Sequence, residues 1–189
     1  MWRQMSVGIG VRLWLLALVI GVSGCANLGQ PEPTPKAGKG GLSSALEHKR
    51  VALEAANQST GISVLASPNE QLQINLPSDF SFDTDAAAIK ASMRPVLDHL
   101  AAGLATPAMA SLLIQVVGFT DSEGAESVNT ALSLARANSV RNYLQSKGIA
   151  ATRLSAEGRG EQAPLAGNDK RYGRALNRRV EIYLREPGL

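Results

Sequence analysis

Few side chains in this 189-residue sequence have the types and spacing that catalysis requires. The two histidines, His48 and His99, have no second metal-ligating residue four positions further on, so neither predicts a metal site. Asp83 and Asp85 form a carboxylate pair of the kind that hydrolyses glycosidic bonds, but acidic residues near the first turn of a helix also stabilise its dipole. No G-x-S-x-G motif of a serine hydrolase is present. The sequence therefore predicts a binding protein rather than an enzyme, with no metal and no cofactor.

The only cysteine, Cys25, stands directly after the short run VSG at 22–24. Before this run come an apolar segment at 13–20 and two basic residues, Arg3 and Arg12. A basic segment, a short apolar segment and a small-residue site in this order predict an export signal. The alternative is an uncleaved membrane anchor, but the apolar segment is shorter than the roughly 20 residues that a membrane-spanning helix needs. A single cysteine also excludes a disulfide framework within the chain.

Residues 1–25 resemble a bacterial lipoprotein signal that ends in a lipobox. The resemblance implies that residues 1–24 form the signal peptide and that Cys25 becomes the first mature residue and carries the acyl chains. Acylation would also explain a lone thiol in an oxidising compartment. Position 26 is Ala rather than the Asp that commonly retains such lipoproteins in the inner membrane. The resemblance thus implies an anchor in outer-membrane lipid, on the periplasmic face.

A second pattern, of glycine, charged and aliphatic residues at fixed spacing, fills most of the C-terminal half of the chain. It includes GFTDSEG at 118–124, LSLARA at 132–137 and GRALNRRVE at 173–181. The pattern resembles the OmpA-like C-terminal domain, and with FSFD at 80–83 the resemblance extends over roughly residues 70–185. It is similar to peptidoglycan-associated lipoproteins and to the periplasmic ends of outer-membrane porins and flagellar stator proteins. The resemblance implies binding, without cleavage, to the peptide stems of peptidoglycan.

The resemblance also implies a two-point site for the diaminopimelate of the stem. The side chain of diaminopimelate ends in an ammonium and a carboxylate on one carbon, so its recognition needs an anion and a bidentate cation a few ångströms apart. By position in the family pattern, Asp121 takes the ammonium and Arg136 takes the carboxylate. Fifteen residues separate the two, or about 22 Å if all were helical. The prediction therefore requires the loop 119–124 to fold back over the start of the following helix.

Three further positions belong to the implied ligand site: Thr120, Asn129 and Arg178. Thr120 and Asn129 either shape the loop or add a polar contact, and Arg178 either reaches the ligand or pairs with an acidic residue. The sequence departs from the family pattern at Phe119, where the family often has histidine, and at Arg159, where it often has an aromatic residue. These departures bear on fine specificity and not on the class of protein.

The elements that must position these residues alternate between strand and helix. Apolar residues at helical spacing predict a helix over 86–104, before Pro107, and a longer helix over 125–147 that stops at Gly148. Apolar runs of strand length predict strands at 112–117, 154–157 and 180–184. The fold class predicted is α+β, an OmpA-like βαβαβ-β domain in which two main helices pack on a small mixed sheet.

Residues 42–69 predict a helix-and-strand extension before the domain at 70–189. Ser44 and Glu47 have capping-box spacing and open a predicted helix over 44–57. Alternating residues on both sides of the turn SPNE at 67–70 then predict a hairpin. The helix could dock on the domain, bind a partner or lengthen the tether, and the sequence leaves these three alternatives open.

Residues 25–41 are predicted to form the acylated cysteine and a flexible tether, because the segment is rich in proline and glycine and almost lacks large apolar residues. Removal of the signal leaves 17 basic residues, out of 19, against 16 acidic ones. A nearly balanced charge gives no basis for nucleic-acid binding.

The function predicted is therefore an outer-membrane lipoprotein that binds peptidoglycan through diaminopimelate and tethers the outer membrane to the cell wall. The alternative is an OmpA-like subunit of a larger envelope complex for secretion, motility or signalling. In that case a protein partner is expected, and wall binding only positions the complex.

Overall fold

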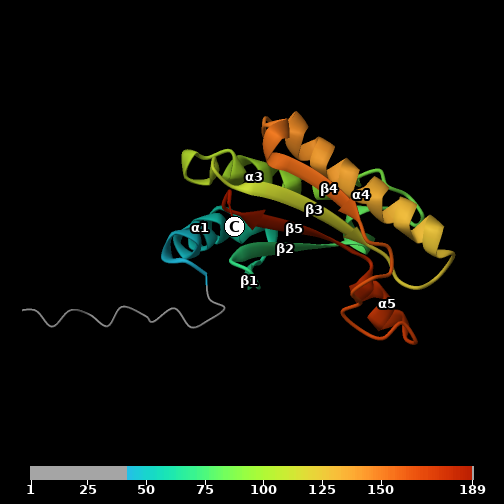
Figure 1. Cartoon of the computed structure of the whole chain (residues 1–189). Coiled ribbons are helices and arrows are strands. Elements are labelled where there is room, and N and C mark those ends of the chain that lie inside the picture. Colours follow the sequence, from blue (N-terminus) through green and yellow to red (C-terminus); the bar gives the residue numbers. More distant parts are fainter. Residues whose placement is uncertain (1–41, 189) are drawn as a thin grey trace, which may run out of the picture. The chain divides into compact units, whose positions relative to one another are not determined.

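A five-stranded mixed sheet organises residues 42–188, the part of the chain that the computed structural model describes (Figure 1). The predicted signal peptide, Cys25 and the tether lie outside these residues. The strands are β1 (Val64–Ser67), β2 (Gln71–Pro77), β3 (Leu113–Phe119), β4 (Leu154–Gly158) and β5 (Arg179–Arg185). They stand in the order β1-β2-β5-β3-β4, with β3 and β4 parallel and the other neighbours antiparallel.

Helices cover one face of this sheet, and Figure 1 shows α3 and α4 on the same side of it. Within the described residues the α-helices are α1 (Ser44–Ala56), α2 (Ser78–Ser81), α3 (Arg94–Leu104), α4 (Glu126–Ser146) and α5 (Arg171–Asn177). Four short 3₁₀ turns lie at Gln58–Thr60, Ala91–Met93, Pro107–Met109 and Ala151–Arg153. Buried side chains of α1, α3 and α4 share one core with those of the strands. The predicted mixed sheet with two main helices is confirmed, and α1 adds a third.

Alternation along β5 gives the two faces of the sheet different chemistry. Val180 and Ile182 are fully buried in the core that the helices cover. Because successive side chains of a strand point to opposite faces, Arg179 and Glu181 lie on the other face. A shift of one residue in pairing would place these charges in the core, so the pattern fixes the register of the strand.

The helix α1 docks on the domain, which is the first of the three alternatives that the sequence left open. Its Leu46 and Leu53 are fully buried, and α1 contacts α3. The helix cap is Ser43, whose Oγ accepts a hydrogen bond from the N–H of Leu46, one residue before the predicted cap at Ser44. The predicted hairpin is confirmed by the antiparallel pairing of β1 with β2.

The helix predicted over 86–104 is shorter than expected, because α3 begins only at Arg94 after a 3₁₀ turn. Pro95 accounts for this start, since proline lacks an N–H and fits the first turn, where that N–H has no partner within the helix. Before the turn, Ile89 forms an isolated bridge with Phe82. The segment between them is a loop, which leaves its backbone carbonyls free to bind side chains.

Close packing of α4 on the sheet depends on two glycines. A Cβ on Gly118 would lie 2.1 Å from the carbonyl oxygen of Ser133, and a Cβ on Gly158 would lie 2.5 Å from the backbone nitrogen of Leu134. Any other residue at these positions would push the helix away from the sheet. The glycines thus hold the first half of α4 against the C-terminal ends of the parallel strands β3 and β4.

Candidate functional site

A cavity of about 410 Å³ lies where β3 ends and β5 begins. Its walls come from the loop after β3, the residue before β5, the α2 turn, the loop between α2 and α3, α4, and Arg171 of α5. All five residues that the sequence predicted for the ligand site line this cavity: Thr120, Asp121, Asn129, Arg136 and Arg178. The structure brings them together, and their part in ligand binding stays a prediction.

The loop after β3 folds back over the first turn of α4, as the two-point site requires. The side-chain Nδ2 of Asn129 donates hydrogen bonds to the carbonyl oxygens of Asp121 and Glu123, at 3.2 and 3.1 Å. Gly124 has a φ of +95°, a conformation that glycine adopts without steric cost. Of the two roles predicted for Asn129, the structure shows that it shapes the loop.

Arg136 is a buried guanidinium that forms no ion pair with any carboxylate of residues 42–188. The residue is 4% exposed. Its Nε donates to the carbonyl oxygen of Ala86 at 2.9 Å, its Nη2 donates to that of Asp83 at 3.4 Å, and its Cζ lies 5.3 Å from the centroid of the Phe82 ring. Burial lowers the pKa of Arg136, although arginine remains protonated at neutral pH. Carbonyl dipoles compensate a buried positive charge only in part, so this group is prepared to bind an anion.

Asp121 provides a carboxylate whose side chain is 8% exposed. Its Oδ1 accepts a hydrogen bond from the N–H of Glu123 at 3.0 Å, and its Oδ2 accepts one from Nη1 of Arg178 at 2.6 Å. Each carboxylate oxygen can accept two hydrogen bonds, so the Asp121 carboxylate retains acceptor capacity for a ligand ammonium.

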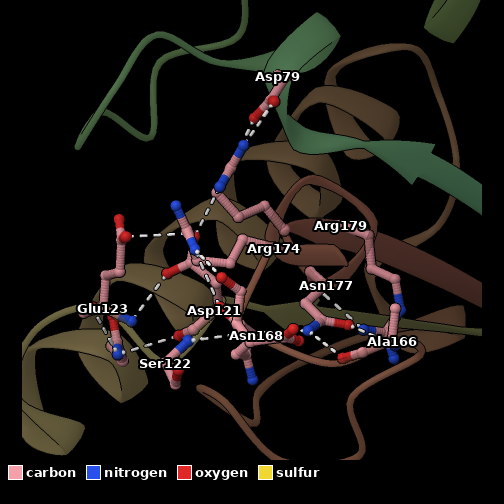
Figure 2. Close-up of polar contacts among 12 residues, drawn as sticks. Asp79, Asp121, Ser122, Glu123, Ala166, Asn168, Arg174, Asn177 and Arg179 are labelled. Atoms are coloured by element: carbon pink, nitrogen blue, oxygen red, sulfur yellow. Dashed lines mark hydrogen bonds and ion pairs between the residues drawn. The ribbon is translucent and has the colours of Figure 1, made fainter. Parts of the chain in front are cut away.

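Arg178 joins Asp121 to a second carboxylate, that of Asp79 on α2. Figure 2 labels both aspartates and draws the polar contacts around them as dashed lines. Its Nε and Nη2 donate to Oδ1 and Oδ2 of Asp79 at 2.8 and 2.7 Å. These hydrogen bonds raise the pKa of Arg178 and lower the pKa of Asp79. Of the two roles predicted for Arg178, the structure shows the pairing with acidic residues. The sequence analysis missed Asp79, whose only signal was its place two residues after the end of β2.

Two buried hydroxyl groups in the cavity wall have no hydrogen-bond partner within the described residues. They are Oγ1 of Thr120 and Oγ of Ser78, in residues that are 5% and 1% exposed. Leaving a buried hydroxyl unpaired costs about 1–3 kcal/mol, so both groups are candidates to bond a ligand. Thr120 was predicted, whereas nothing in the local sequence distinguishes Ser78.

The described residues contain no cluster of three or more His, Cys, Asp or Glu side chains that could hold a metal ion. Among the same residues, no helix has both the length and the apolar character to cross a bilayer.

The sequence model of the OmpA family matches residues 81–178, which is more than half of the chain. The chain belongs to the OmpA family. The matched segment includes the loop after β3, Arg136 and Arg178, so it contains most of the cavity wall. The resemblance inferred from the sequence pattern is confirmed.

Relatives of this OmpA-family chain include lipoproteins and a wall anchor. The probable lipoprotein YiaD of Escherichia coli (strain K12) is 32% identical over 145 residues, which cover 77% of this chain and 65% of YiaD, just under two thirds of that relative. The cell wall anchor of the T6SS from Pseudomonas aeruginosa superposes with a TM-score of 0.62 at 27% identity, covering 72% of this chain and 96% of the anchor. The peptidoglycan-associated lipoprotein from Burkholderia pseudomallei gives 0.51 at 26% identity, covering 56% and 88%.

The two departures from the OmpA-family pattern lie away from the cavity. Phe119 is 1% exposed, and the guanidinium carbon of Arg179 lies 3.8 Å from its ring centroid. Arg159 pairs with Glu157 at 2.8 Å. Neither Phe119 nor Arg159 contributes to the cavity wall. These two departures from the family pattern therefore do not change the charged groups that line the cavity.

Proposed function

We propose that this protein is an outer-membrane lipoprotein that binds peptidoglycan, without cleaving it, through the diaminopimelate of the peptide stem. The observation that carries the proposal is the guanidinium of Arg136, which is buried in the cavity wall without a carboxylate partner among residues 42–188. A ligand carboxylate would neutralise this guanidinium through the bidentate pairing that arginine favours. Asp121 in the same cavity offers an acceptor for the ligand ammonium.

The proposed ligand suits the size and polarity of the cavity. Both charges of the diaminopimelate end group sit on one carbon, so both of their protein partners must line one small site. Asp121 follows β3 and Arg136 lies on α4, and the packing of α4 on Gly118 brings both into the cavity wall. A volume of about 410 Å³ is in the usual range for small-molecule sites. The cavity therefore suits one amino-acid end group of a polymer.

The relatives support both the wall-binding and the membrane part of the proposal. One is described as a cell wall anchor, one as a peptidoglycan-associated lipoprotein and one as a probable lipoprotein. In this proposal the acyl chains on Cys25 insert into outer-membrane lipid, residues 26–41 act as a spacer, and the domain over 70–189 binds peptidoglycan. The protein would thereby tether the outer membrane to the wall from the periplasmic side.

A second candidate function is favoured by the similarity to the T6SS anchor. The chain would then be a subunit of a larger envelope complex, and wall binding would only position that complex. The apolar side of α1 offers no free surface for this partner, because Leu46 and Leu53 are buried in the core. Cross-linking in intact cells distinguishes the two functions. A second protein cross-linked to this chain in fixed stoichiometry is expected only if the chain is a subunit of an envelope complex.

Sedimentation with purified diaminopimelate-type peptidoglycan tests the proposed site. Asp121→Ala and Arg136→Ala should each weaken binding about 10- to 150-fold, because each removes a charge-assisted contact of about 1.5–3 kcal/mol. Arg136→Lys should also weaken binding, because lysine keeps the charge but loses the planar fork. Arg141→Ala is the matched control, since Arg141 lies on the same helix and, within residues 42–188, its side chain bonds only to Asn142. Full sedimentation of both alanine variants would place the site elsewhere on the domain.

A further inference from the structure

A second hollow, of about 600 Å³, lies on the sheet face opposite the helices. Its floor is made by outward-facing side chains of β2, β5 and β3, and its rims are the turn at 67–69 and the loop at 163–165. No residue of this wall also lines the cavity around Arg136. We call it the sheet groove, and its floor residues are Gln71, Gln73, Gln115, Phe119, Arg179, Glu181 and Tyr183, with Arg159 beside them.

Each charged side chain of the sheet groove is paired with an opposite charge. Nε of Arg179 donates to Oε1 of Glu181 at 2.7 Å, and both side chains are 3% exposed. The hydroxyl of Tyr183 donates to the second oxygen of Glu181 at 2.5 Å. Arg159 pairs with Glu157, which lies on the neighbouring strand β4. Each charge in the groove wall thus has a partner, so the groove is matched to an uncharged ligand.

Neutral hydrogen-bonding groups cross the floor of the groove in a row. The pairing of the strands places Gln73 of β2 and Gln115 of β3 on either side of Tyr183 on β5. Two strand spacings make this row about 10 Å long. The side-chain amides of Gln71 and Gln73 bond to nothing in residues 42–188, and Gln115 uses only its Nε2, which donates to Glu157. Free amide groups beside a partly exposed aromatic ring are suited to hydroxyl groups and apolar C–H faces.

One rim of the groove, the loop at 163–165, is bonded to the floor. Ala163 has a φ of +49°, which is unfavourable for any residue but glycine, and its carbonyl oxygen accepts a hydrogen bond from Nη2 of Arg179 at 3.0 Å. Asn69 on the opposite rim has a φ of +63°. Leu165 is 56% exposed and adds an apolar surface beside the amides. The groove is therefore shaped before a ligand binds.

The sheet groove and the cavity around Arg136 begin at the same strand ends. At the end of β3, Phe119 lines the groove and the next residue, Thr120, lines the cavity. At the start of β5, Arg178 lines the cavity and Arg179 lines the groove. One polymer could therefore place one chemical group in the cavity around Arg136 and another in the sheet groove, because the two hollows meet at these strand ends.

We propose that the sheet groove binds the sugar backbone of the cell wall, a neutral and hydroxyl-rich glycan strand. The inference rests on the proposed function, because the stem held in the cavity is covalently attached to that strand. A free anionic polymer would find no unpaired cation in the groove wall, whereas sugar hydroxyls match the unpaired amides and sugar C–H faces match the Tyr183 ring and Leu165. The wall would then be held by two distinct sites on one domain.

Two soluble probes separate the sites in the purified full-length protein in detergent. One is a soluble β-1,4-linked oligomer of N-acetylglucosamine, which is the wall glycan stripped of its stems and of the lactyl carboxylates that carry them (the stripped strands). The other is the stem tripeptide that ends in diaminopimelate. The double variant Gln71→Ala/Gln73→Ala should bind the stripped strands about tenfold more weakly and the tripeptide as tightly as wild type. Arg136→Ala should show the reverse. Gln145→Ala, which removes an exposed amide from α4, is the matched control and should bind both probes normally.

Each outcome of this experiment bears on one proposal. If the wild type does not bind the stripped strands, or if the double variant binds them like wild type, the groove does not hold glycan and a protein ligand becomes the better match. If the wild type binds the strands but not the tripeptide, the diaminopimelate site is overturned while the glycan groove is supported.

Discussion

Nη1 of Arg178 lies 2.6 Å from Oδ2 of Asp121, while the remaining edge of the same guanidinium binds both oxygens of Asp79. One arginine therefore holds two carboxylates that are far apart in the sequence. With Oδ1 bonded to the backbone of its own loop, Asp121 is fixed before any ligand arrives. A group that is already ordered loses less entropy on binding, so this arrangement favours affinity.

Asp79 should titrate below the ordinary aspartate pKa of about 3.9. The hydrogen bonds from Arg178 lower the pKa of Asp79, so its contribution to stability is complete above about pH 4 and is lost as the pH falls through the lowered pKa. An NMR titration of the Asp79 carboxyl carbon measures this value. In Arg178→Ala the pKa of Asp79 should move up towards 3.9. An unshifted Asp79 in the wild-type protein would mean that the pair does not form in solution.

Gly118→Ala should destabilise the domain by about 3 kcal/mol, the upper end of the usual range for overpacking. The new methyl group would meet the backbone of Ser133, and a helix backbone cannot move aside as a flexible side chain can. Gly148→Ala is the control, because it meets no atom within 4 Å and carries only the cost of its φ of +95°, about 1–2 kcal/mol. Urea denaturation compares the two variants. Equal losses of stability would show that α4 does not pack closely on β3.

Limited trypsin digestion should cut at Lys36 and Lys39 in the predicted tether and spare Lys49 and Arg50 of α1. The helix is protected because its Leu46 and Leu53 are buried in the core. Mass spectrometry of the stable fragment identifies its first residue.

Leu53→Ala should expose the bonds of α1 to trypsin, because a buried Leu→Ala change typically costs 2–5 kcal/mol. Val51→Ala, at a position that is 51% exposed, should leave the digestion pattern unchanged. Rapid cleavage within α1 of the wild-type protein would contradict the docking of this helix.

Cys25→Ala should abolish membrane anchoring, because the proposed acyl chains have no other attachment point in a chain with one cysteine. The variant should appear as soluble periplasmic protein or as uncleaved precursor. Fractionation with a carbonate wash distinguishes these forms from a lipid-anchored protein. Recovery in the membrane fraction equal to wild type would rule out Cys25 as the anchor.

Much of the fold could be predicted because it depends on local patterns. The long apolar period of α4 with its stop at Gly148 and the alternation in β5 follow from burial of one face. The continuous apolar run of β3 follows from burial on both faces in the second half of the strand. The start of α3 could not be read from the period alone, because Ala86 and Ile89 keep the helical spacing while the chain there forms a loop. A pattern of burial does not report where backbone hydrogen bonds begin.

The candidate site was partly predictable for a different reason. Asp121 and Arg136 belong to a family pattern of fixed spacing, so the sequence alone pointed to both. The sequence did not reveal Asp79 or the unpaired hydroxyl of Ser78, because each becomes significant only through a partner or a cavity formed by distant segments. Nor did it show that Arg136 lacks a carboxylate partner among the described residues, because such a partner can come from any segment that folding brings near it. Local sequence thus determined the elements and the types of group available, whereas the tertiary structure decided which charges neutralise each other and which remain for a ligand, because that depends on distances between segments that only folding brings together.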